Sequence, residues 1–351
     1  MRIDEIRTPA LLIDLDGMES NLDRMAAFFR DKPAKLRPHF KNHKVPLLAW
    51  KQIEAGAIGM CCATVREAEI LVQHGIRSIL IANEVSANDK IEWIADLSRH
   101  ADVIVAVDDE RIVEDMACIA RKRRSALSVV VDVNVGLNRC GVQPGEPACR
   151  LAKTVVEKGL RFRGVMGYEG HLQALPPGEE RDRLVSVVDT SLVDSRKLIE
   201  AEGIPVEIVS TSGTGTYAEA GAYPGVTEIQ AGSYLLMDTI YMNRGSTFRR
   251  SLTILVSVIS RPEPGRAVVD CGLKELSAER GLSTVKGIEG VELQAQHAEH
   301  GLLKIGNPAA GVTVGQKIEL WVQYSDATVN LHRQMYGVRN GEVEEVFAIE
   351  H

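Results

Sequence analysis

The stretch IRSILIANEVSANDKIEWIADLSRHADVIVAVDDE (residues 76–110) contains one complete β-α-β unit. Within it, SILIANE (78–84) and DVIVAVD (102–108) are short apolar runs rich in Ile and Val, which are typical of strands buried in a parallel sheet. The segment NDKIEWIADLSRH (88–100) between them has apolar residues at helical spacing. A strand, a helix and a second strand in this order predict two parallel strands joined by a crossover helix.

The same alternation continues on both sides of this unit. The other expected strands lie at 35–41, 57–63, 127–134, 162–169, 206–212 and 227–234, and further amphipathic segments lie at 65–75 and 180–203. Eight such units over about 210 residues are typical of a (β/α)8 TIM barrel and less typical of an open doubly wound sheet. The sequence therefore predicts an α/β protein built on a barrel.

The pattern changes after about residue 245. Strand-like runs separated by Gly/Pro turns follow, without helices long enough to join parallel strands, at 252–261, 266–272, 316–323 and 341–349. We therefore expect a barrel domain over residues 1–245 and a C-terminal antiparallel β domain over 246–351. The run ALLIDLD (10–16) is expected to pair with this β domain or to lead into the barrel.

The composition is that of a globular protein and argues against several function classes. The 351 residues are 25% charged and have a formal net charge of −7. No apolar run approaches the about 18 residues of a membrane helix, and Met1 precedes charged residues instead of a signal-peptide core, so we expect a cytoplasmic protein without a membrane partner. The sequence has no basic cluster with interleaved aromatic residues, which argues against nucleic-acid binding. The cysteines lack CxxC spacing, which favours reduced thiols over disulfides or zinc.

The motif HFKNHK (39–44) places Lys41 at the carboxyl end of the first expected barrel strand. In this fold, chemistry takes place at the carboxyl ends of the strands. Lys41 has two interpretations. It is either a solvated surface lysine or an amine that forms a Schiff base with a carbonyl, in which case cationic neighbours such as Lys44 and Arg37 favour the neutral, reactive form.

Gly/Ser/Thr-rich loops follow the seventh and eighth expected strands. STSGTGTY (210–217) and GSY (232–234) offer hydroxyls and main-chain N–H groups that can bind a phosphate, although either loop could be an ordinary turn. GYEGH (167–171) follows the sixth strand, and Arg139 follows the fifth, where it either faces a ligand or pairs with a carboxylate. A lysine, a phosphate-binding loop and a basic or aromatic residue at one barrel mouth predict pyridoxal 5′-phosphate as the cofactor.

A series of short motifs resembles one family in order along nearly the whole chain. They are TPALLIDLD, LRPHFKNHK, GMCCATVREAE, ANEV, NRCGV, GYEGH, SGTGTY, EIQAGSYLLMD, VVDCGLKELS, AEHG and YGVRNGEVE. With them the chain resembles the fold-type III pyridoxal-phosphate enzymes, and within these the group of D-threonine aldolase, D-serine dehydratase and 3-hydroxy-D-aspartate aldolase. The resemblance implies an alanine racemase-like barrel and a lyase that acts on small β-hydroxy-D-amino acids.

The resemblance also implies roles for individual residues. It makes Lys41 the residue that forms the internal aldimine and moves the Cα proton, and it places Arg139 and Tyr168 against the cofactor ring. The remaining cofactor-binding positions surround the phosphate and are Ser212, Gly213, Thr214, Gly232, Ser233 and Tyr234. Relatives of this group are homodimers, so a homodimer with a shared site is expected.

Three positions depart from the family pattern. Phe40 stands where the family usually has a small residue, and Ala63 stands where a polar residue often meets the cofactor. The family also binds a divalent metal through a His-x-Cys or His-x-Asp pair, and here Tyr324 falls on the histidine position and Asp326 on the second ligand position. A neutral tyrosine is a poor ligand for Mg²⁺, Mn²⁺ or Zn²⁺, so the usual metal site is in question.

The expected reaction is retro-aldol cleavage, in which a base removes the proton of the β-hydroxyl group. His171 is the candidate base, with a structural loop histidine as the alternative, and His300 and His332 are further candidates. His332 could also replace the missing metal ligand. Three other functions stay open: β-elimination by a dehydratase, amino-acid racemisation, and a non-catalytic pyridoxal-phosphate carrier. The residues after 245 argue against the carrier, because such carriers resemble the barrel alone.

Overall fold

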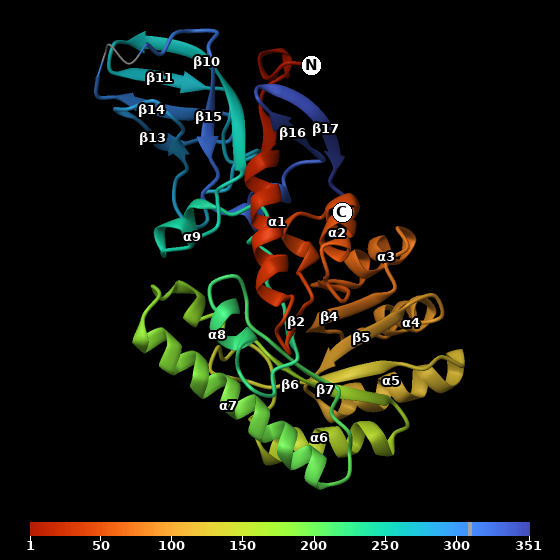
Figure 1. Ribbon diagram of the computed structural model, residues 1–351. Coiled ribbons are helices and arrows are strands. Elements are labelled where there is room, and N and C mark those ends of the chain that lie inside the picture. Colours follow the sequence, from red (N-terminus) through yellow and green to blue (C-terminus); the bar gives the residue numbers. More distant parts are fainter. Residues whose placement is uncertain (308–310) are drawn as a thin grey trace. The chain divides into compact units, whose positions relative to one another are not determined.

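The computed structural model describes residues 1–307 and 311–351. The chain forms two compact units (Figure 1). One unit, the barrel unit, consists of residues 25–41 and 46–232; the other, the β unit, consists of residues 1–24, 42–45 and 233–351. The segment 42–45 and the N-terminal residues thus belong to the β unit. The boundaries of the compact units differ from the expected domain boundary at about residue 245. The domain division stays a prediction.

The barrel unit contains an eight-stranded parallel sheet. The strand order is β2-β9-β8-β7-β6-β5-β4-β3. These strands are β2 (Lys35–Leu36), β3 (Met60–Cys62), β4 (Ser78–Glu84), β5 (Asp102–Val107), β6 (Ser128–Asp132), β7 (Arg161–Gly167), β8 (Ile208–Thr211) and β9 (Glu228–Ile229). Main-chain hydrogen bonds from Ile58 N to Leu36 O and from Cys61 N to Pro38 O join the two ends of this order, so the sheet closes. The predicted (β/α)8 barrel is confirmed.

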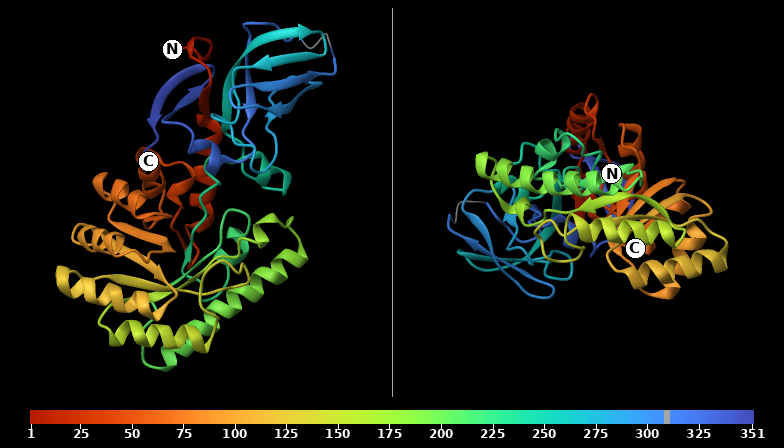
Figure 2. Two further views of the ribbon diagram at one scale, coloured as in Figure 1. Left: turned by 180° about the vertical axis from the view of Figure 1, so that it is seen from behind. Right: turned by 90° about the horizontal axis from the view of Figure 1, so that it is seen from below.

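Helices cover the outside of this sheet, as Figure 1 and Figure 2 show. They are α2 (Pro46–Glu54), α3 (Val65–Gln73), α4 (Asn88–Leu97), α5 (Glu110–Arg123), α6 (Glu146–Glu157), α7 (Glu179–Ala201) and α8 (Tyr217–Gly221), with short 3-10 turns η2 (Phe40–Asn42) and η3 (Leu172–Ala174). Helix α1 (Leu15–Phe29) runs along the chain from the β unit into the barrel unit. Local chemistry starts several of the helices: the Thr64 side chain, for example, accepts a hydrogen bond from Glu67 N and caps α3.

Side chains from successive strands fill the inside of the barrel. The cluster is formed by Cys61, Leu80, Ile104, Ala106, Val130, Met166 and Ile208, all buried. They come from the neighbouring strands β3 to β8, so the loss of one strand would expose the side chains of the others. Strands that are buried on both faces explain why the sequence shows continuous apolar runs there.

Several expected barrel strands are shorter than the sequence indicates, and the difference is largest for β2 and β9. The run 35–41 is a strand only at Lys35–Leu36, and the run 227–234 only at Glu228–Ile229. Pro38 has no N–H group and cannot donate to a neighbouring strand, so the ladder stops and the chain turns into η2. Lys41 therefore lies on this 3-10 turn and not on the strand itself.

The β unit is built on a nine-stranded mixed sheet. Its main order is β13-β14-β11-β10-β1-β16-β17, and β15 joins β10 and β12. The strands are β1 (Ala10–Asp14), β10 (Leu252–Glu263), β11 (Arg266–Val269), β12 (Thr284–Val285), β13 (Val291–Gln296), β14 (Gly301–Ile305), β15 (Lys317–Trp321), β16 (Gln334–Arg339) and β17 (Glu342–Ala348). The remaining helices of this unit are α9 (Thr239–Asn243), α10 (Ser325–Val329) and the 3-10 turn η1 (Ile3–Glu5).

Strand β1 lies in the middle of this sheet. It pairs antiparallel with β10, with Ala10 opposite Leu255, and parallel with β16, with Leu12 opposite Tyr336. Apart from β1 and β16, the pairs are antiparallel. The sequence did not indicate β12, β13, β14 and β16, because these strands are short or alternate apolar with polar residues, as in VELQAQ (291–296).

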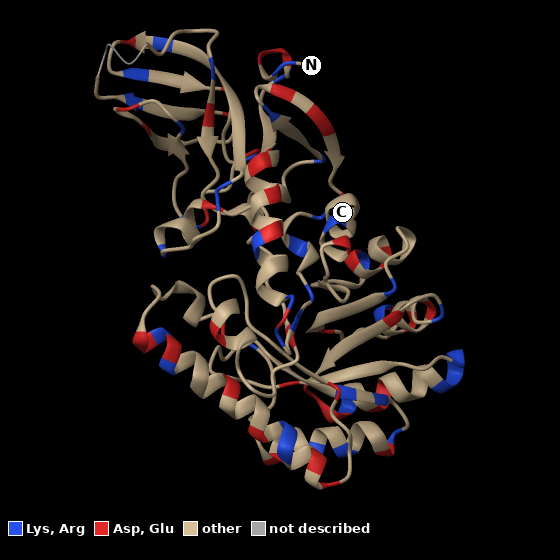
Figure 3. Ribbon diagram, viewed as in Figure 1, with Lys and Arg blue, Asp and Glu red and all other residues tan. Residues whose placement is uncertain are grey.

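Charged residues of the barrel unit are found mostly on the outer helices (Figure 3). The basic run at the C-terminal end of α5, Arg121 to Arg124, complements the negative end of the helix dipole. Arg123 also pairs with Glu92 and Asp96 of α4, at 2.5 and 3.2 Å. No helix in the described residues has both the length and the apolar character needed to cross a bilayer.

The pairing of β7 with β8 predicts a specific steric effect at Gly164. A Cβ atom there would lie 1.9 Å from Ile208 O on the neighbouring strand, at a φ of +153°. We expect Gly164→Ala to lower the free energy of unfolding by about 2–4 kcal/mol in urea denaturation. Gly178 is the matched control, because it has the same φ of +153° and no atom within 4 Å of the place that a Cβ would take. Gly178→Ala should cost only about 1 kcal/mol of backbone strain, and equal losses in the two variants would contradict the steric explanation.

Candidate active site

The strand order brings the predicted cofactor residues of the barrel unit to one edge. Strands β2, β9 and β8 are direct neighbours, with Leu36 opposite Ile229 and Thr211 opposite Ile229. The segments that follow them, including Lys41, Gly232 and the Ser212–Thr216 loop, therefore leave the sheet at its carboxyl edge. A Cβ on Gly232 would lie only 2.8 Å from His39 O, so the chain needs glycine where this loop passes the segment that leads to Lys41.

Lys41 is exposed on η2, and its main-chain N–H group donates a hydrogen bond to His39 Nδ1 at 3.4 Å. Among the neighbours expected to favour a neutral amine, Arg37 is already paired: its guanidinium forms two hydrogen bonds with Glu228, at 2.9 and 2.7 Å, inside the unit. The neighbouring Cys61 thiol is no counter-ion for Lys41, because burial raises its pKa to about 12. Arg37 therefore anchors the base of this segment to β9.

Glu169 holds the Gly/Ser/Thr loop after β8 through hydrogen bonds. Its buried carboxylate accepts hydrogen bonds from Ser212 N at 3.2 Å, from Thr211 Oγ1 at 3.3 Å and from Thr216 Oγ1. Burial raises the pKa of Glu169, and the hydrogen bonds from Thr216 and its other partners oppose this rise. Ser212 itself has a φ of +71°, which is rare for a residue with a side chain. This conformation is held by the Glu169 contacts.

Gln173 adds a second support to the same loop. Its Nε2 donates to Glu169 Oε1 at 3.1 Å, and its Oε1 accepts from Gly215 N at 2.7 Å. A Cβ at Gly213 would lie 3.1 Å from Gln173 Oε1, a close approach that would require the Gln173 side chain to shift. Thr214 lies between these supports and is 5% exposed. Glu169 and Gln173 were not predicted from the sequence, although Glu169 stands inside the motif GYEGH.

Arg139 and Tyr168 form a pair at the ends of β6 and β7. The Arg139 guanidinium carbon lies 5.9 Å from the centroid of the Tyr168 ring. Both line one small cavity together with Asp132, Cys140 and other residues of the loop after β6. No carboxylate lies within ion-pair distance of Arg139 in the described residues, although the Asp132 carboxyl group is near enough to interact with it electrostatically. Both interpretations of Arg139 therefore stay predictions.

His171 lies at the same side of the barrel unit. It is exposed just before η3, and its Cε1 and Nε2 atoms lie 3.2 and 3.3 Å from the position that a Cβ on Gly136 would occupy. Gly136 belongs to the loop that carries Arg139. The structure thus brings the candidate base next to the loop of a predicted cofactor residue, and the absence of a Cβ makes room for the imidazole.

Ser233 and Tyr234 belong to the β unit. The Tyr234 ring is fully buried and packs against Phe248 with a centroid distance of 5.8 Å, so a contact from this residue to a ligand would have to come from the main chain. Ser233 Oγ lies 3.5 Å from Asn42 Nδ2.

Two of the positions that depart from the family pattern lie in the barrel unit. Phe40 is fully buried, and the main-chain N–H group of Ala63 donates to Glu67 Oε2 at 2.7 Å.

The predicted metal position in the β unit does not have the chemistry of a cation site. Asp326 Oδ1 already accepts a hydrogen bond from Asn42 Nδ2 at 2.7 Å. Burial and the nearby Asp326 carboxylate raise the pKa of Tyr324 to about 12, so its phenol stays protonated, and the Arg280 guanidinium lies over its ring at 5.7 Å. A cation next to a protonated phenol and an arginine is disfavoured. These residues do not fit the family's metal.

The two further histidine candidates do not change this result. A ring nitrogen of His332 is hydrogen-bonded to Glu275 O at 2.7 Å, and burial lowers the pKa of His332. This main-chain contact gives His332 a structural role in the β unit and does not make it a replacement ligand. His300 is exposed next to strand β14.

Comparison with known proteins identifies the family of this chain. Residues 13–239 match the family described as the alanine racemase N-terminal domain, and residues 251–338 match the putative serine dehydratase domain. The chain belongs to the alanine racemase N-terminal domain family. A 3-hydroxy-D-aspartate aldolase from Paracoccus denitrificans and a D-threonine aldolase from Arthrobacter sp are each 34% identical to this family member, over 98% of its chain and 92% of theirs.

Solved structures agree with these matches. The D-threonine aldolase from Filomicrobium marinum has a TM-score of 0.95 and 35% identity, covering 99% of this family member and 96% of that chain. The D-threo-3-hydroxyaspartate dehydratase from Delftia sp. HT23 has a TM-score of 0.93 and 27% identity, covering 100% and 99%. The fold class and the family resemblance predicted from the sequence motifs are confirmed.

A buried acid beneath the loop network predicts a pH dependence of stability. Asp189 of α7 is 1% exposed, and burial together with the Glu169 and Glu219 carboxylates raises its pKa from 3.8 to about 8. Because the folded-state pKa is raised, the contribution of Asp189 to stability is complete below about pH 4 and is lost as the pH rises towards 8, by about 1.4 kcal/mol per pH unit. Asp189→Asn should therefore stabilise the protein more at pH 8 than at pH 5.

Urea denaturation of both proteins at the two pH values measures this difference. Asp182→Asn is the matched control, because Asp182 lies on the same helix but is exposed. A stability difference between Asp189→Asn and the unchanged protein that is the same at both pH values would contradict the assignment.

Proposed function

We propose that this protein is a pyridoxal-phosphate-dependent lyase that cleaves small β-hydroxy-D-amino acids by a retro-aldol reaction, giving glycine and an aldehyde. The observation that carries the proposal is the full-length likeness to two named aldolases, at 34% identity over 98% of the chain. The barrel unit supports it with a lysine, a hydroxyl-rich loop and an arginine at the carboxyl ends of its strands.

The residues present in the barrel unit fit the cofactor. Glycines at 213 and 232 leave no Cβ in loops that are already closely packed, and a hydroxyl-bearing residue, Ser212 or Thr214, stands on each side of Gly213. Such a loop can surround a phosphate with N–H and O–H donors. Lys41 would attach the cofactor through its amine, and Arg139 and Tyr168 would face its ring. When bound, pyridoxal phosphate withdraws electrons from the Cα atom of an amino acid and so weakens the bonds at that atom.

The chain's own residues supply the proton transfers of the proposed reaction. His171 accepts the proton of the substrate's β-hydroxyl group, which allows the Cα–Cβ bond to break and an aldehyde to leave. The Lys41 amine returns a proton to Cα, and glycine is the second product. His171 suits this role because its ring is exposed to solvent and lies over Gly136, in the loop that carries Arg139.

No step of this reaction is assigned to a metal at Tyr324 and Asp326, since these residues do not fit one. A histidine base is sufficient for retro-aldol cleavage, whereas β-elimination requires the hydroxyl group itself to leave, which is the step that a Lewis acid assists most. The side chains of this chain therefore favour the aldolase over the dehydratase. The dehydratase remains the second candidate, because a D-threo-3-hydroxyaspartate dehydratase is 28% identical over 89% of the chain.

The proposal includes two statements about the protein's surroundings. We place it in the cytoplasm as a homodimer, on the basis of its family resemblance. Light scattering of the purified protein would test the dimer and should give about twice the 38.4 kDa mass of one chain.

Replacement of Lys41 tests the proposed function directly. With pyridoxal phosphate added, the unchanged protein should show an aldimine absorbance band, leave a borohydride-stable adduct on the peptide containing Lys41, and release an aldehyde and glycine from D-threonine in the presence of EDTA. Lys41→Arg should lose the adduct and at least about 10³-fold in kcat, because a guanidinium is not deprotonated. Lys90→Ala, an exposed lysine on α4, is the control and should keep both.

The products decide between the candidate functions. Ammonia with a keto acid would indicate the dehydratase, and loss of optical rotation alone would indicate a racemase. Either result would contradict the aldolase, while an adduct on a lysine other than Lys41 would contradict the assignment of the site.

A further inference from the structure

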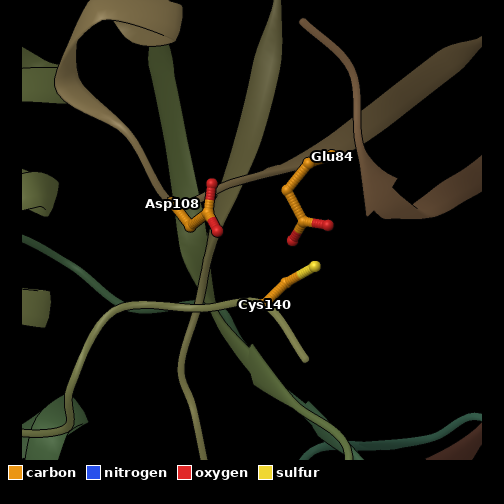
Figure 4. A group of neighbouring side chains, drawn as sticks. All are labelled: Glu84, Asp108 and Cys140. Atoms are coloured by element: carbon orange, nitrogen blue, oxygen red, sulfur yellow. The ribbon is translucent and has the colours of Figure 1, made fainter. Parts of the chain in front are cut away.

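Two carboxylates and a thiol converge at the carboxyl ends of β4, β5 and β6 (Figure 4). Glu84 is the last residue of β4, Asp108 follows β5, and Cys140 lies in the loop after β6. One ligand atom from each residue lies within 4.8 Å of the other two. Within residues 1–307 and 311–351 this is the single group of three or more such side chains at that spacing.

The negative charge of this group is compensated only in part within the described chain, by the nearby Arg139 guanidinium. Asp132, the last residue of β6, is more than nine-tenths buried, and its carboxyl group lies within hydrogen-bonding reach of the Glu84 carboxyl group. No N–H or O–H group in the described residues donates to the Asp132 side chain, and Glu84 Oε1 is buried without a hydrogen-bond partner. Two carboxylates that meet out of water without a donor require either a shared proton or a cation.

The remaining contacts leave room for a cation at this point. Asp108 Oδ2 accepts one hydrogen bond, from Gly141 N at 3.0 Å, and keeps its other oxygen available. Glu84, Asp108 and Cys140 are all partly exposed, so an ion can enter from solvent. In a tetrahedral site with bond lengths of about 2.0–2.3 Å, the ligand atoms lie roughly 3.3–3.8 Å apart, so the three atoms would approach one another from their present spacing of 4.8 Å or less.

We propose that Glu84, Asp108 and Cys140 bind one divalent cation of the zinc type, with the buried Asp132 carboxylate beside it. Two carboxylate oxygens and one sulfur suit Zn²⁺ better than Mg²⁺, which avoids thiolate ligands and prefers oxygen. Cys140 binds as the thiolate, so its proton is released to solvent when the ion enters. The site uses none of the residues on which the family's metal position falls, and it does not depend on the proposed function.

The position of the site gives the cation a structural role. Cys140 directly follows Arg139, and the loop is closed at its base by hydrogen bonds from Val142 N to Asp132 O and from Asn134 N to Val142 O. A cation shared by Cys140, Glu84 and Asp108 would fasten the C-terminal part of this loop to the ends of two neighbouring strands. It would thereby hold Arg139, a positioning effect that does not involve contact with the reacting atoms.

Metal titration of the full-length, pyridoxal-phosphate-loaded protein tests the site. After EDTA treatment and removal of the chelator, Zn²⁺ should bind at about one ion per chain in competition with a coloured chelator. Cys140→Ser and Asp108→Asn should each weaken this binding at least about 100-fold. Cys118→Ser and Asp115→Asn are the matched controls, because both residues are exposed on α5 outside the group, and both should bind Zn²⁺ unchanged.

A second measurement reads the thiol itself and needs no variant that could fail to fold. Zn²⁺ should slow the alkylation of Cys140 by iodoacetamide at least about tenfold and leave that of Cys118 unchanged, as peptide mass spectrometry can show. Unprotected Cys140, or equal Zn²⁺ affinity in the variants and the unchanged protein, would overturn the proposal and leave a proton shared by Glu84 and Asp132. Zn²⁺ binding lost only in Asp326→Asn would also overturn it. Neither readout uses lyase activity, so the cation-site proposal fails or succeeds separately from the proposed function.

Discussion

Closure of the barrel between β2 and β3 is the constraint on which the site depends. Two main-chain hydrogen bonds, from Ile58 N to Leu36 O and from Cys61 N to Pro38 O, join the ends of the strand order. Because closure removes the open edges of the sheet, it completes the core inside the barrel. It also fixes where the chain leaves β2, and the 3-10 turn with Lys41 follows directly. The buried pair of Arg37 and Glu228 anchors the same segment to β9.

Buried carboxylates shape the loops at the carboxyl edge of the barrel. Glu169 accepts hydrogen bonds from Thr211, Ser212 and Thr216 at the end of β8, and so holds Ser212 in a conformation that an isolated peptide would rarely adopt. Asp108 binds the main chain of the loop after β6 through Gly141 N. Acidic side chains thus help to order both of these loops. A phosphate-bearing ligand would meet loops that are already in position, which lowers the entropy lost on binding.

The stretch around Tyr324 forms an internal hydrogen-bond network at the position where the family resemblance implies a metal site. Asn42 donates to Asp326 and to Ser325 Oγ, and Ser325 in turn donates to Asp238. A protonated tyrosine in place of a histidine removes a strong ligand, and the Asn42 contact occupies an oxygen of the remaining one. Every residue of this network belongs to the β unit, whereas most of the predicted cofactor-binding residues belong to the barrel unit.

The sequence by itself determined the barrel, the family and the candidate lysine. Apolar runs such as DVIVAVD carry strand periodicity within a few residues, and HFKNHK and SGTGTY are local motifs, so short-range patterns were enough. Only the tertiary structure decided that Arg37 is paired, that Glu169 supports the loop after β8, and that Glu84, Asp108 and Cys140 converge. These relations join residues far apart in the chain through the register of parallel strands, and no local pattern encodes that register.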